Sequence, residues 1–295
     1  MFKINSNNVL RELRFSINIT SESESFLIHL KDCTINLNEV NVIWYWRWHQ
    51  YDINELYKWE ESESKIRHFI NEEIERISQF LFRYNSNIYV LGNRFINKIE
   101  VLLRAKSIGI LIPNTVVTQT KDELVFFYYQ NKSIIVKPIS NPIFIYEEDR
   151  TLATYTKMLS RDDIETIPDT CFPVLAQKYI DKDFEIRSFY IDGFFYSSAI
   201  ISQCDDMTKI DFRNYNLDKP NRVVPFNLPT EIETKLIKLF NLLKIETCSI
   251  DVILNNGEYY LLDINPVGQY DMVSYPCNYE LSEVIANHLI LKDKV

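Results

Sequence analysis

The sequence contains few glycines, and none of them forms a glycine-rich nucleotide-binding loop. Only five of the 295 residues are glycine, and neither G-x-G-x-x-G nor G-K-[ST] occurs. This excludes the dinucleotide-binding and P-loop routes to a nucleotide. The sequence also lacks a signal peptide and any long apolar run, so we expect a soluble, cytoplasmic protein without a membrane partner.

The sequence likewise lacks an excess of basic residues and a recognisable cysteine motif. Lys and Arg number 32 against 41 Asp and Glu, a formal net charge of -9, which argues against nucleic acid as a partner. The five cysteines are odd in number and show no C-x-x-C spacing, which favours reduced thiols over a disulfide framework. The composition, 46% hydrophobic and 25% charged, is that of an ordinary globular protein.

The most informative segment is SIDVILNNGEYYLLDINPVGQ, at residues 249–269. Two runs rich in β-branched, leucine and tyrosine residues, Ser249–Leu254 and Glu258–Asn265, flank the sequence Asn255-Asn256-Gly257. Such runs on either side of an Asn-Gly pair predict a β-hairpin. We expect all three intervening residues to form the loop, with the glycine in the left-handed region.

The register of this hairpin decides whether its acidic residues converge. Asp263 and Asn265 share a strand face because side chains alternate with a period of two. A three-residue loop puts Asp251 on that face, whereas a two-residue loop would put it on the opposite one. Two carboxylates and an amide oxygen on one face suit Mg²⁺, which binds oxygen ligands together with substrate phosphates. The pattern alone equally allows solvated acids beside a turn.

The string DINPVGQY from Asp263 onward, followed by PCNY at residues 276–279, carries a resemblance to a known family. It resembles the metal-binding hairpin of the ATP-grasp superfamily, which implies that Asp251, Asp263 and Asn265 bind two Mg²⁺ ions on the phosphates of ATP. The longer string is similar to that of microviridin-type ligases and, among these, to the grasp-with-spasm (graspetide-forming) maturases of ribosomal peptides. Asp263 stands where most ATP-grasp enzymes carry Glu.

Two lysines are candidates for binding the phosphates. Ser133–Pro138 predicts a strand that ends at Lys137, and an ammonium group in that position favours an anionic partner. The resemblance implies that Lys137 binds the α and β phosphates and that residues 139–148 form a lid over them. It also places Lys98, on a helix predicted over Asn93–Ile108, near the phosphates. From the residues alone, a structural Lys137 and a solvated Lys98 stay open.

A second specific string is PVLAQKYI followed by FEIRSF, within residues 173–189. The resemblance implies an extended linker whose backbone binds adenine. The linker residues are Gln177, Lys178, Tyr179 and Ile180. Glu185 and Arg187 share a strand face, and the resemblance places Glu185 near the linker and Arg187 toward the phosphates or the substrate. A salt bridge on a solvated face is the alternative.

Asp211-Phe212-Arg213 is similar to the Asp-Trp-Arg of the peptide-crosslinking ATP-grasp ligases. Arg213 would present a planar guanidinium to a carboxylate or to the γ phosphate. With Arg187, it gives two candidate catalytic arginines. No nucleophile on the enzyme is required for the implied chemistry.

The resemblance implies an α+β fold in which a nucleotide is clamped between two antiparallel sheets. We expect an N-terminal α/β domain at residues 1–90, a central lid subdomain at 91–180 and a C-terminal domain at 181–295. Relatives usually carry a strand-helix unit before the segment that matches Phe2–Asn5, so we expect either that the first domain lacks this unit or that the sequence is truncated at its start.

The implied activity is ADP-forming ligation with ATP and Mg²⁺. A side-chain carboxylate of Asp or Glu in a ribosomal precursor peptide (leader plus core) is activated as an acyl phosphate. A Ser or Thr hydroxyl then gives an ester, or a Lys amine gives an amide. Two alternatives remain: an ATP-grasp ligase that adds amino acids to a peptide or small molecule, and a nucleotide-binding protein without catalysis. A homodimer is one possible assembly, and the sequence does not determine how many molecules assemble.

Overall fold

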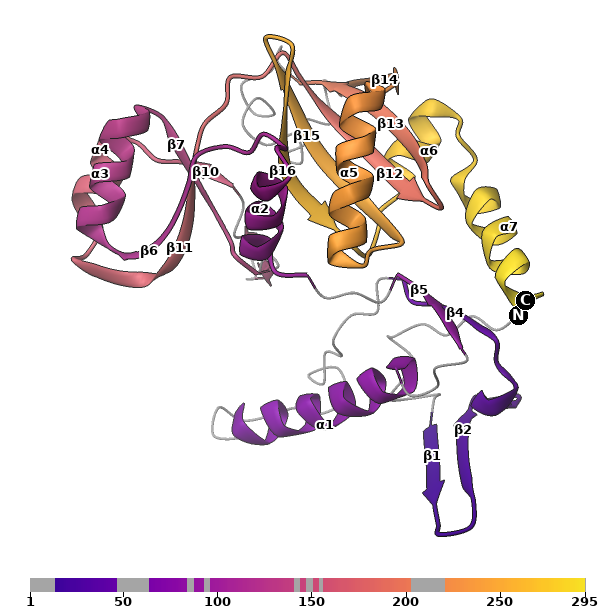
Figure 1. Ribbon diagram of the computed structural model, residues 1–295. Helices are drawn as coiled ribbons and strands as arrows, with labels where there is room; N and C mark the ends of the chain where they lie inside the picture. Colours follow the sequence, from indigo (N-terminus) through magenta and orange to yellow (C-terminus); the bar gives the residue numbers. More distant parts are fainter. Residues whose placement is uncertain are drawn as a thin grey trace. The chain divides into compact units, whose positions relative to one another are not determined.

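The computed structural model describes residues 14–46, 64–83, 88–92, 96–140, 144–146, 151–153, 156–202 and 221–294. The chain divides into two compact units (Figure 1). Unit 1 comprises residues 1–93 and 282–295, and unit 2 comprises Arg94–Leu281. The three expected domains divide the chain more finely and stay a prediction. In these segments no helix is both long and apolar enough to cross a membrane.

Unit 1 combines a small antiparallel sheet with a strand-helix-strand segment. Its elements are β1 (Arg14–Ile19), β2 (Glu24–His29), β3 (Thr34–Asn36), the 3-10 turn η2 (Leu37–Glu39), β4 (Val42–Trp44), α1 (Ser64–Arg83), β5 (Tyr89–Leu91) and α7 (Leu281–Asp293). The strands β4 and β5 pair in parallel, which requires a crossover connection, and α1 lies in it. Phe26 and Ile28 of β2 pack against Ile77 and Phe80 of α1. Phe2–Asn5 lies outside the described residues.

The first half of unit 2 is a four-stranded antiparallel sheet, here called the lid sheet, with strand order β10-β7-β11-β6. Its elements are β6 (Thr115–Thr120), α3 (Lys121–Asn131), β7 (Ile134–Lys137), β10 (Lys157–Met158), α4 (Arg161–Thr166) and β11 (Thr170–Lys178). Leu124 and Phe127 of α3, with Ile164 of α4, pack on Ile134 and Ala176 of the sheet. β8 (Phe144–Tyr146) and β9 (Thr151–Ala153) pair as a separate ribbon.

The second half of unit 2 is a five-stranded antiparallel sheet, here called the C-terminal sheet, with strand order β14-β13-β12-β15-β16. Its elements are α2 (Lys98–Ser107), β12 (Phe184–Ile191), β13 (Phe194–Ile201), β14 (Arg222–Phe226), α5 (Thr230–Leu243), β15 (Thr247–Asn255), β16 (Glu258–Asn265) and α6 (Asp271–Cys277). The predicted pair of antiparallel sheets is therefore confirmed.

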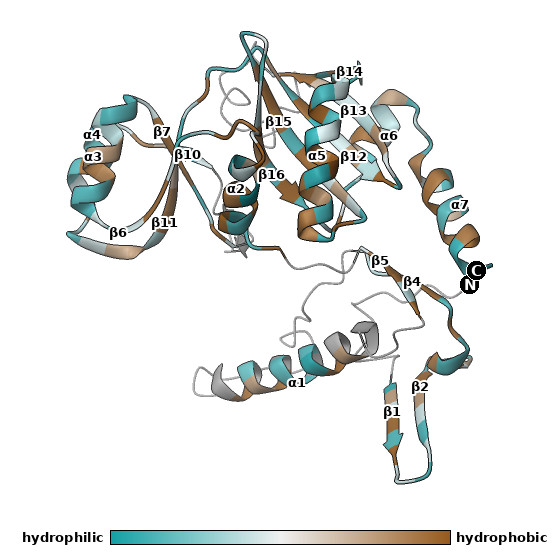
Figure 2. Ribbon diagram, in the orientation of Figure 1, coloured by the Kyte–Doolittle hydropathy of each residue, from teal (hydrophilic) through white to brown (hydrophobic). Residues whose placement is uncertain are grey.

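Strand alternation gives the C-terminal sheet one apolar and one polar face. Ile186, Ile250 and Val252 are buried in a core with residues of α2 and α5. In Figure 2, α5 is banded brown and teal, as expected of a helix that buries one side. Arg187 and Asp251 are the chain neighbours of Ile186, Ile250 and Val252. They must point to the other face of the sheet because the side-chain period of a strand is two. The apolar side thus stabilises the sheet and leaves the polar side for a site.

The turn of the β15–β16 hairpin is shorter than the sequence predicts. Asn255 pairs with Glu258, so only Asn256 and Gly257 form the loop, and their φ angles are 49° and 81°. Positive φ at both central residues is the signature of a two-residue type I′ turn. The predicted three-residue loop is wrong, because Asn256 accepts the left-handed conformation and frees Asn255 to extend the strand.

A β-bulge restores the convergence that the shorter turn would have removed. Val252 pairs with Leu261, but the next pair is Asp251 with Asp263, so Leu262 is an extra residue on β16. An extra residue changes the face of every side chain beyond it. Asp251, Asp263 and Asn265 therefore share one face, as predicted, although by a different route.

Candidate active site

A cleft in unit 2 runs between the lid sheet and the polar face of the C-terminal sheet. Its lining residues are Pro113, Ile135, Lys137, Thr156, Gln177, Lys178, Tyr179, Ile180, Lys182, Glu185, Asp251, Ile253, Leu262 and Asp263. Most of the residues predicted for the site are among them, although they come from segments far apart in the sequence. We therefore place the candidate active site in this cleft.

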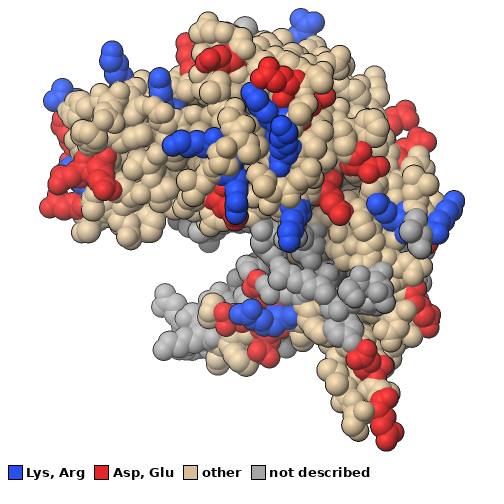
Figure 3. All heavy atoms as spheres, in the orientation of Figure 1, with Lys and Arg blue, Asp and Glu red and all other residues tan. Residues whose placement is uncertain are grey.

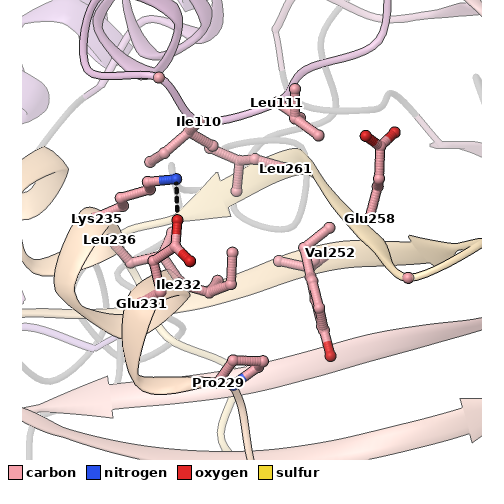
Figure 4. Close-up of a pocket in the computed structure, with 13 residues that line it drawn as sticks. Ile110, Leu111, Pro229, Glu231, Ile232, Lys235, Leu236, Val252, Glu258 and Leu261 are labelled. Atoms are coloured by element: carbon pink, nitrogen blue, oxygen red, sulfur yellow. Dashed lines mark hydrogen bonds and ion pairs between the residues drawn. The ribbon is translucent and has the colours of Figure 1, made fainter.

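A larger cavity of about 370 Å³ lies on the apolar side of the C-terminal sheet (Figure 4). It is lined mainly by apolar residues of α5, the hairpin and the segment after α2, such as Ile232, Val252 and Leu111. Its ammonium group, on Lys235, already pairs with Glu231 at 2.7 Å. None of the predicted site residues lines this cavity, so the cleft remains the better candidate despite its smaller size.

The two carboxylates of the predicted metal site are cross-strand partners on β15 and β16. Their side chains keep 26% and 33% exposure for Asp251 and Asp263, so their oxygens can be reached from the cleft. Arg187 Nη1 lies 2.6 Å from Asp251 Oδ1, and Lys98 Nζ lies 3.6 Å from Asp263 Oδ2. Like charges directly opposite one another destabilise a sheet, and these two cations offset that repulsion.

The donor set fits Mg²⁺ in the way the sequence suggests. Among the described residues no group of three or more His, Cys, Asp or Glu could bind a metal. Mg²⁺ commonly takes one or two carboxylates and completes its shell with water and substrate phosphates, so two carboxylates suffice. The Oδ1 atom of Asn265 accepts the N–H of Val267 at 3.1 Å and retains a second acceptor site.

Lys137 joins the lid sheet to the bulge in β16. Its Nζ donates to the carbonyl oxygen of Leu262 at 3.0 Å. Leu262 is the extra residue of the bulge, and the extra residue of a bulge interrupts the regular ladder of its strand. The bulge thus does two things: it turns Asp263 toward Asp251, and it presents a carbonyl to the lysine at the end of β7.

Lys98 lies at the start of α2 and contacts the chain that follows β7. Its Nζ donates to the carbonyl oxygens of Pro138 and Ser140 at 3.2 and 3.3 Å, besides its ion pair with Asp263. The helix begins there because the Asn97 side chain accepts the N–H groups of the first turn. The ammonium of Lys98 therefore lies at the cleft rather than in open solvent.

The linker between the two sheets has some of its backbone groups already engaged. The N–H groups of Lys178 and Tyr179 donate to the carbonyls of Asn114 and Ser133, each at 2.9 Å. A hydrogen bond to adenine from those two groups would need these bonds to break. Ile180 is the next residue, and no backbone hydrogen bond from its N–H is found among the described residues. We therefore expect Ile180 to supply the donor.

Two linker side chains are also fixed by their surroundings. Gln177 is fully buried, and its Nε2 donates to Thr115 Oγ1 at 2.9 Å. Burial, assisted by the nearby carboxylate of Asp181, raises the pKa of the Tyr179 hydroxyl, so that group stays neutral. The side chains of Gln177 and Tyr179 thus hold the linker in place, which agrees with recognition of adenine through the linker backbone.

Glu185 and Arg187 are both buried, at 6% and 4% exposure, so a salt bridge on a solvated face is wrong. Arg187 pairs with Asp251 on β15. Glu185 pairs with Lys182, a residue that sequence reasoning missed. The only indication of Lys182 in the sequence was that it is a basic residue three positions before the acidic Glu185, in a polar segment. Arg213 lies outside the described residues.

The described cysteines carry no chemistry in the cleft. Cys33, Cys171, Cys248 and Cys277 are free thiols, which confirms the prediction for these four. Burial raises the pKa of the Cys248 thiol well above its ordinary value, which makes it a poor nucleophile. Cys204 lies outside the described residues.

Comparison with known proteins supports the assignment of the fold. No protein-family model matches the chain. An uncharacterised protein of Methanocaldococcus jannaschii is 26% identical over 204 residues, 68% of this chain and 48% of that protein, so the chain spans about half of that relative. A RiPP-associated ATP-grasp ligase of Chryseobacterium gregarium, solved with ADP and a leader and core peptide, superposes with a TM-score of 0.85. The chain has the ATP-grasp fold.

The ATP-grasp assignment extends over nearly the whole chain. The match to the Chryseobacterium ligase covers 99% of this chain and 88% of that one, at 22% identity. Macrocyclase MdnC of Microcystis aeruginosa, solved with precursor peptide MdnA, has a TM-score of 0.81 and 22% identity over 98% of this chain and 90% of its own. At these identities the likeness concerns the fold, and the activity has to be argued from the cleft.

The loop after the ATP-grasp hairpin depends on Gly268. Its φ is +62°, and a Cβ there would lie 3.0 Å from Cε2 of Phe189, a ring that is buried and packs against Tyr270. We expect Gly268→Ala to destabilise the fold by about 2 kcal/mol, because backbone strain and a clash with a confined ring add. The lower midpoint of urea unfolding measures this.

Gly193→Ala is the matched control for that prediction. Gly193 also has a positive φ, +87°, but no atom lies within 4 Å of an added Cβ. Gly193→Ala should therefore lose only the stability that backbone strain costs, about 1 kcal/mol. Equal losses in the two variants would mean that contact with Phe189 does not constrain the loop.

Proposed function

We propose that this protein is an ATP- and Mg²⁺-dependent ligase that forms cross-links between side chains of one ribosomal precursor peptide. The observation that carries the proposal is the pairing of Asp251 with Asp263 across from Lys137 in a single cleft. The fold supports it, because similar solved proteins are described as a RiPP-associated ATP-grasp ligase with leader and core peptide and as a macrocyclase with its precursor peptide.

Each part of the nucleotide has a complementary part of the cleft. Asp251, Asp263 and Asn265 would bind the magnesium, which neutralises charge on the phosphates when bound. Lys137 and Lys98 supply ammonium groups for the phosphates. The linker, with Ile180 as donor, offers backbone hydrogen bonds to the adenine edge. Glu185 lines the same cleft as the linker and the acidic pair, and its carboxylate could accept the hydroxyls of the ribose.

The proposed chemistry activates a carboxylate of the peptide. An oxygen of an Asp or Glu side chain attacks the γ phosphorus of ATP and releases ADP, which gives an acyl phosphate. A Ser or Thr hydroxyl, or a Lys amine, of the same peptide then attacks the acyl carbon, loses its proton and releases phosphate. The protein orients the groups and stabilises charge as it develops.

Arg187 is the described residue best suited to contact the incoming carboxylate. It is 4% exposed, and its Nε makes no hydrogen bond within the described segments, so a donor is left for an anion. A buried donor without a partner is costly, and a bound carboxylate would satisfy it. We propose that Arg213 shares this task.

The test is the mass of the product. Incubated with its precursor peptide, ATP and Mg²⁺, the protein should produce ADP, phosphate and a peptide lighter by one water per link. Full-length precursor should react faster than the isolated core, because a bound leader raises the effective concentration of the core. A heavier product would indicate an amino-acid ligase, and nucleotide binding without turnover would indicate a non-catalytic protein.

Three finer points belong to the same proposal. We propose two magnesium ions, because a second ion would share the charge of the transferred phosphate. We also propose a homodimer and a cytoplasmic location. Titration of bound Mn²⁺ by electron paramagnetic resonance tests the first, and sedimentation velocity the second. The basic and acidic side chains are interspersed on the face of unit 2 in Figure 3, which argues against nucleic acid as the partner.

A further inference from the structure

Lys182 is a charged side chain in the cleft that the proposed reaction does not use. Its side chain is 2% exposed, and its Nζ forms an ion pair with Glu185, whose side chain is 8% exposed. Lysine is almost never this deeply buried unless it has a charged partner. Both residues line the cleft, beside the linker that we assign to adenine.

The backbone on both sides of Lys182 is attached to the β15–β16 hairpin. Asn255 Nδ2 donates to the carbonyl of Asp181, and the N–H of Asn256 donates to Asp183 Oδ2 at 2.8 Å. The N–H of Asp183 also donates to the carbonyl of Leu254 at 2.8 Å. The hairpin that carries the acidic pair thus fixes the position from which Lys182 reaches Glu185.

The ion pair uses only one of the two oxygens of Glu185. Lys182 Nζ donates to Oε1, and Oε2 accepts no hydrogen bond found within the described residues. An ionised carboxylate is an acceptor only, so a free oxygen in a nucleotide cleft suits a hydroxyl donor. The hydroxyls of a ribose lie between the base and the phosphates. A buried carboxyl without a cation would tend to take up a proton and become a poorer acceptor.

We infer that Lys182 is a positioning residue that keeps Glu185 ionised and oriented to accept the ribose hydroxyls, and so makes the site selective for ribonucleotides. This inference rests on the proposed nucleotide-binding function. Lys182 acts through Glu185 and does not touch the nucleotide. Substitution of Lys182 should therefore reduce the selectivity for the sugar rather than weaken the binding of all nucleotides equally.

The experiment compares the dissociation constants of ATP and 2′,3′-dideoxy-ATP, measured by calorimetry with Mg²⁺ and without peptide. The wild type should prefer ATP by about ten-fold or more, because a hydrogen bond to an ionised group is strong. Lys182→Met should bring the ratio close to one and leave the affinity for the dideoxy nucleotide nearly unchanged. Lys182→Arg, which retains the charge, should restore much of the ratio.

Two controls separate this role from a structural one. Lys238→Met removes an exposed lysine of α5 and should change neither constant. Lys182→Met should also lower the melting temperature, because it leaves a buried carboxylate unpaired, and the double variant with Glu185→Gln should recover part of that loss. The double variant should still show no preference for ATP, which keeps the test valid if the single variant folds poorly.

The outcomes are distinguishable. If wild-type protein binds neither nucleotide, the proposed function fails. If it prefers ATP and Lys182→Met retains that preference, only the inference about Lys182 fails. Equal weakening of both nucleotides by Lys182→Met would also overturn the inference, because it would mean that the ammonium group contacts the base or the phosphates directly.

Discussion

Asp263→Asn should abolish ATP turnover and leave the protein folded. The substitution retains the shape of the side chain and removes its charge, so a metal ion bound as proposed would lose one of its two carboxylate ligands. We expect the turnover number to fall at least about a hundred-fold, about 2.7 kcal/mol of transition-state stabilisation. Release of ADP in the presence of the peptide measures it, and the circular dichroism spectrum checks the fold.

Two further variants make the Asp263 experiment specific. Glu258→Gln changes an acid at the exposed end of the same strand, outside the cleft, and should leave turnover unchanged. Asp263→Glu retains the charge and should be far more active than Asp263→Asn, because a carboxylate remains available as a ligand. If a folded Asp263→Asn variant retained more than about a tenth of the wild-type turnover, the assignment of Asp263 as a metal ligand would be wrong.

Lys137→Ala should weaken the binding of ATP by about ten-fold or more, about 1.4 kcal/mol. Lys137 lies in the cleft at the end of β7, where its ammonium group can bind a phosphate. The same substitution removes the hydrogen bond to Leu262, so the lid sheet also loses a contact with β16. Isothermal titration with a non-hydrolysable ATP analogue measures the change.

Lys157→Ala provides the comparison for Lys137. Lys157 lies on β10, the strand next to β7, but its side chain is 63% exposed and pairs with Asp163 at 2.6 Å. Lys157→Ala should leave nucleotide affinity unchanged.

Arg213→Ala should likewise leave nucleotide binding unchanged and stop cross-linking, because the incoming carboxylate is its expected partner. Equal losses of nucleotide affinity in Lys137→Ala and Arg213→Ala would contradict this division of roles.

The hairpin shows why some features could be predicted and others not. Alternating residues and the Asn-Asn-Gly turn indicated two strands, and the Asp-Ile-Asn string indicated a candidate metal site on the second strand. The loop length was wrong because Asn255 is compatible with both a turn and a strand. The sequence contains no signal of the bulge at Leu262, because Leu261 and Leu262 are equally apolar and nothing local distinguishes the core residue from the extra one.

Charged residues on β12 show a second limit. Alternation correctly placed Glu185 and Arg187 on one face, but it could not tell a solvated face from a buried one. That depends on partners distant in the sequence: Asp251 is 64 positions from Arg187. Lys182 was missed for the same reason, since burial of an ammonium group is decided by what surrounds it and not by its neighbours in the chain.

The sequence by itself indicated most of the candidate site residues, the order of the strands and helices that present them and, on β12, that Glu185 and Arg187 share a face. These properties follow from local backbone preferences and from the two-residue period of a strand. Only the tertiary structure decided that the lysines of α2 and β7 reach the hairpin, that Lys182 neutralises Glu185, and that one extra residue turns Asp263 toward Asp251. Those contacts depend on long-range packing and on a shift of register, which no local pattern encodes.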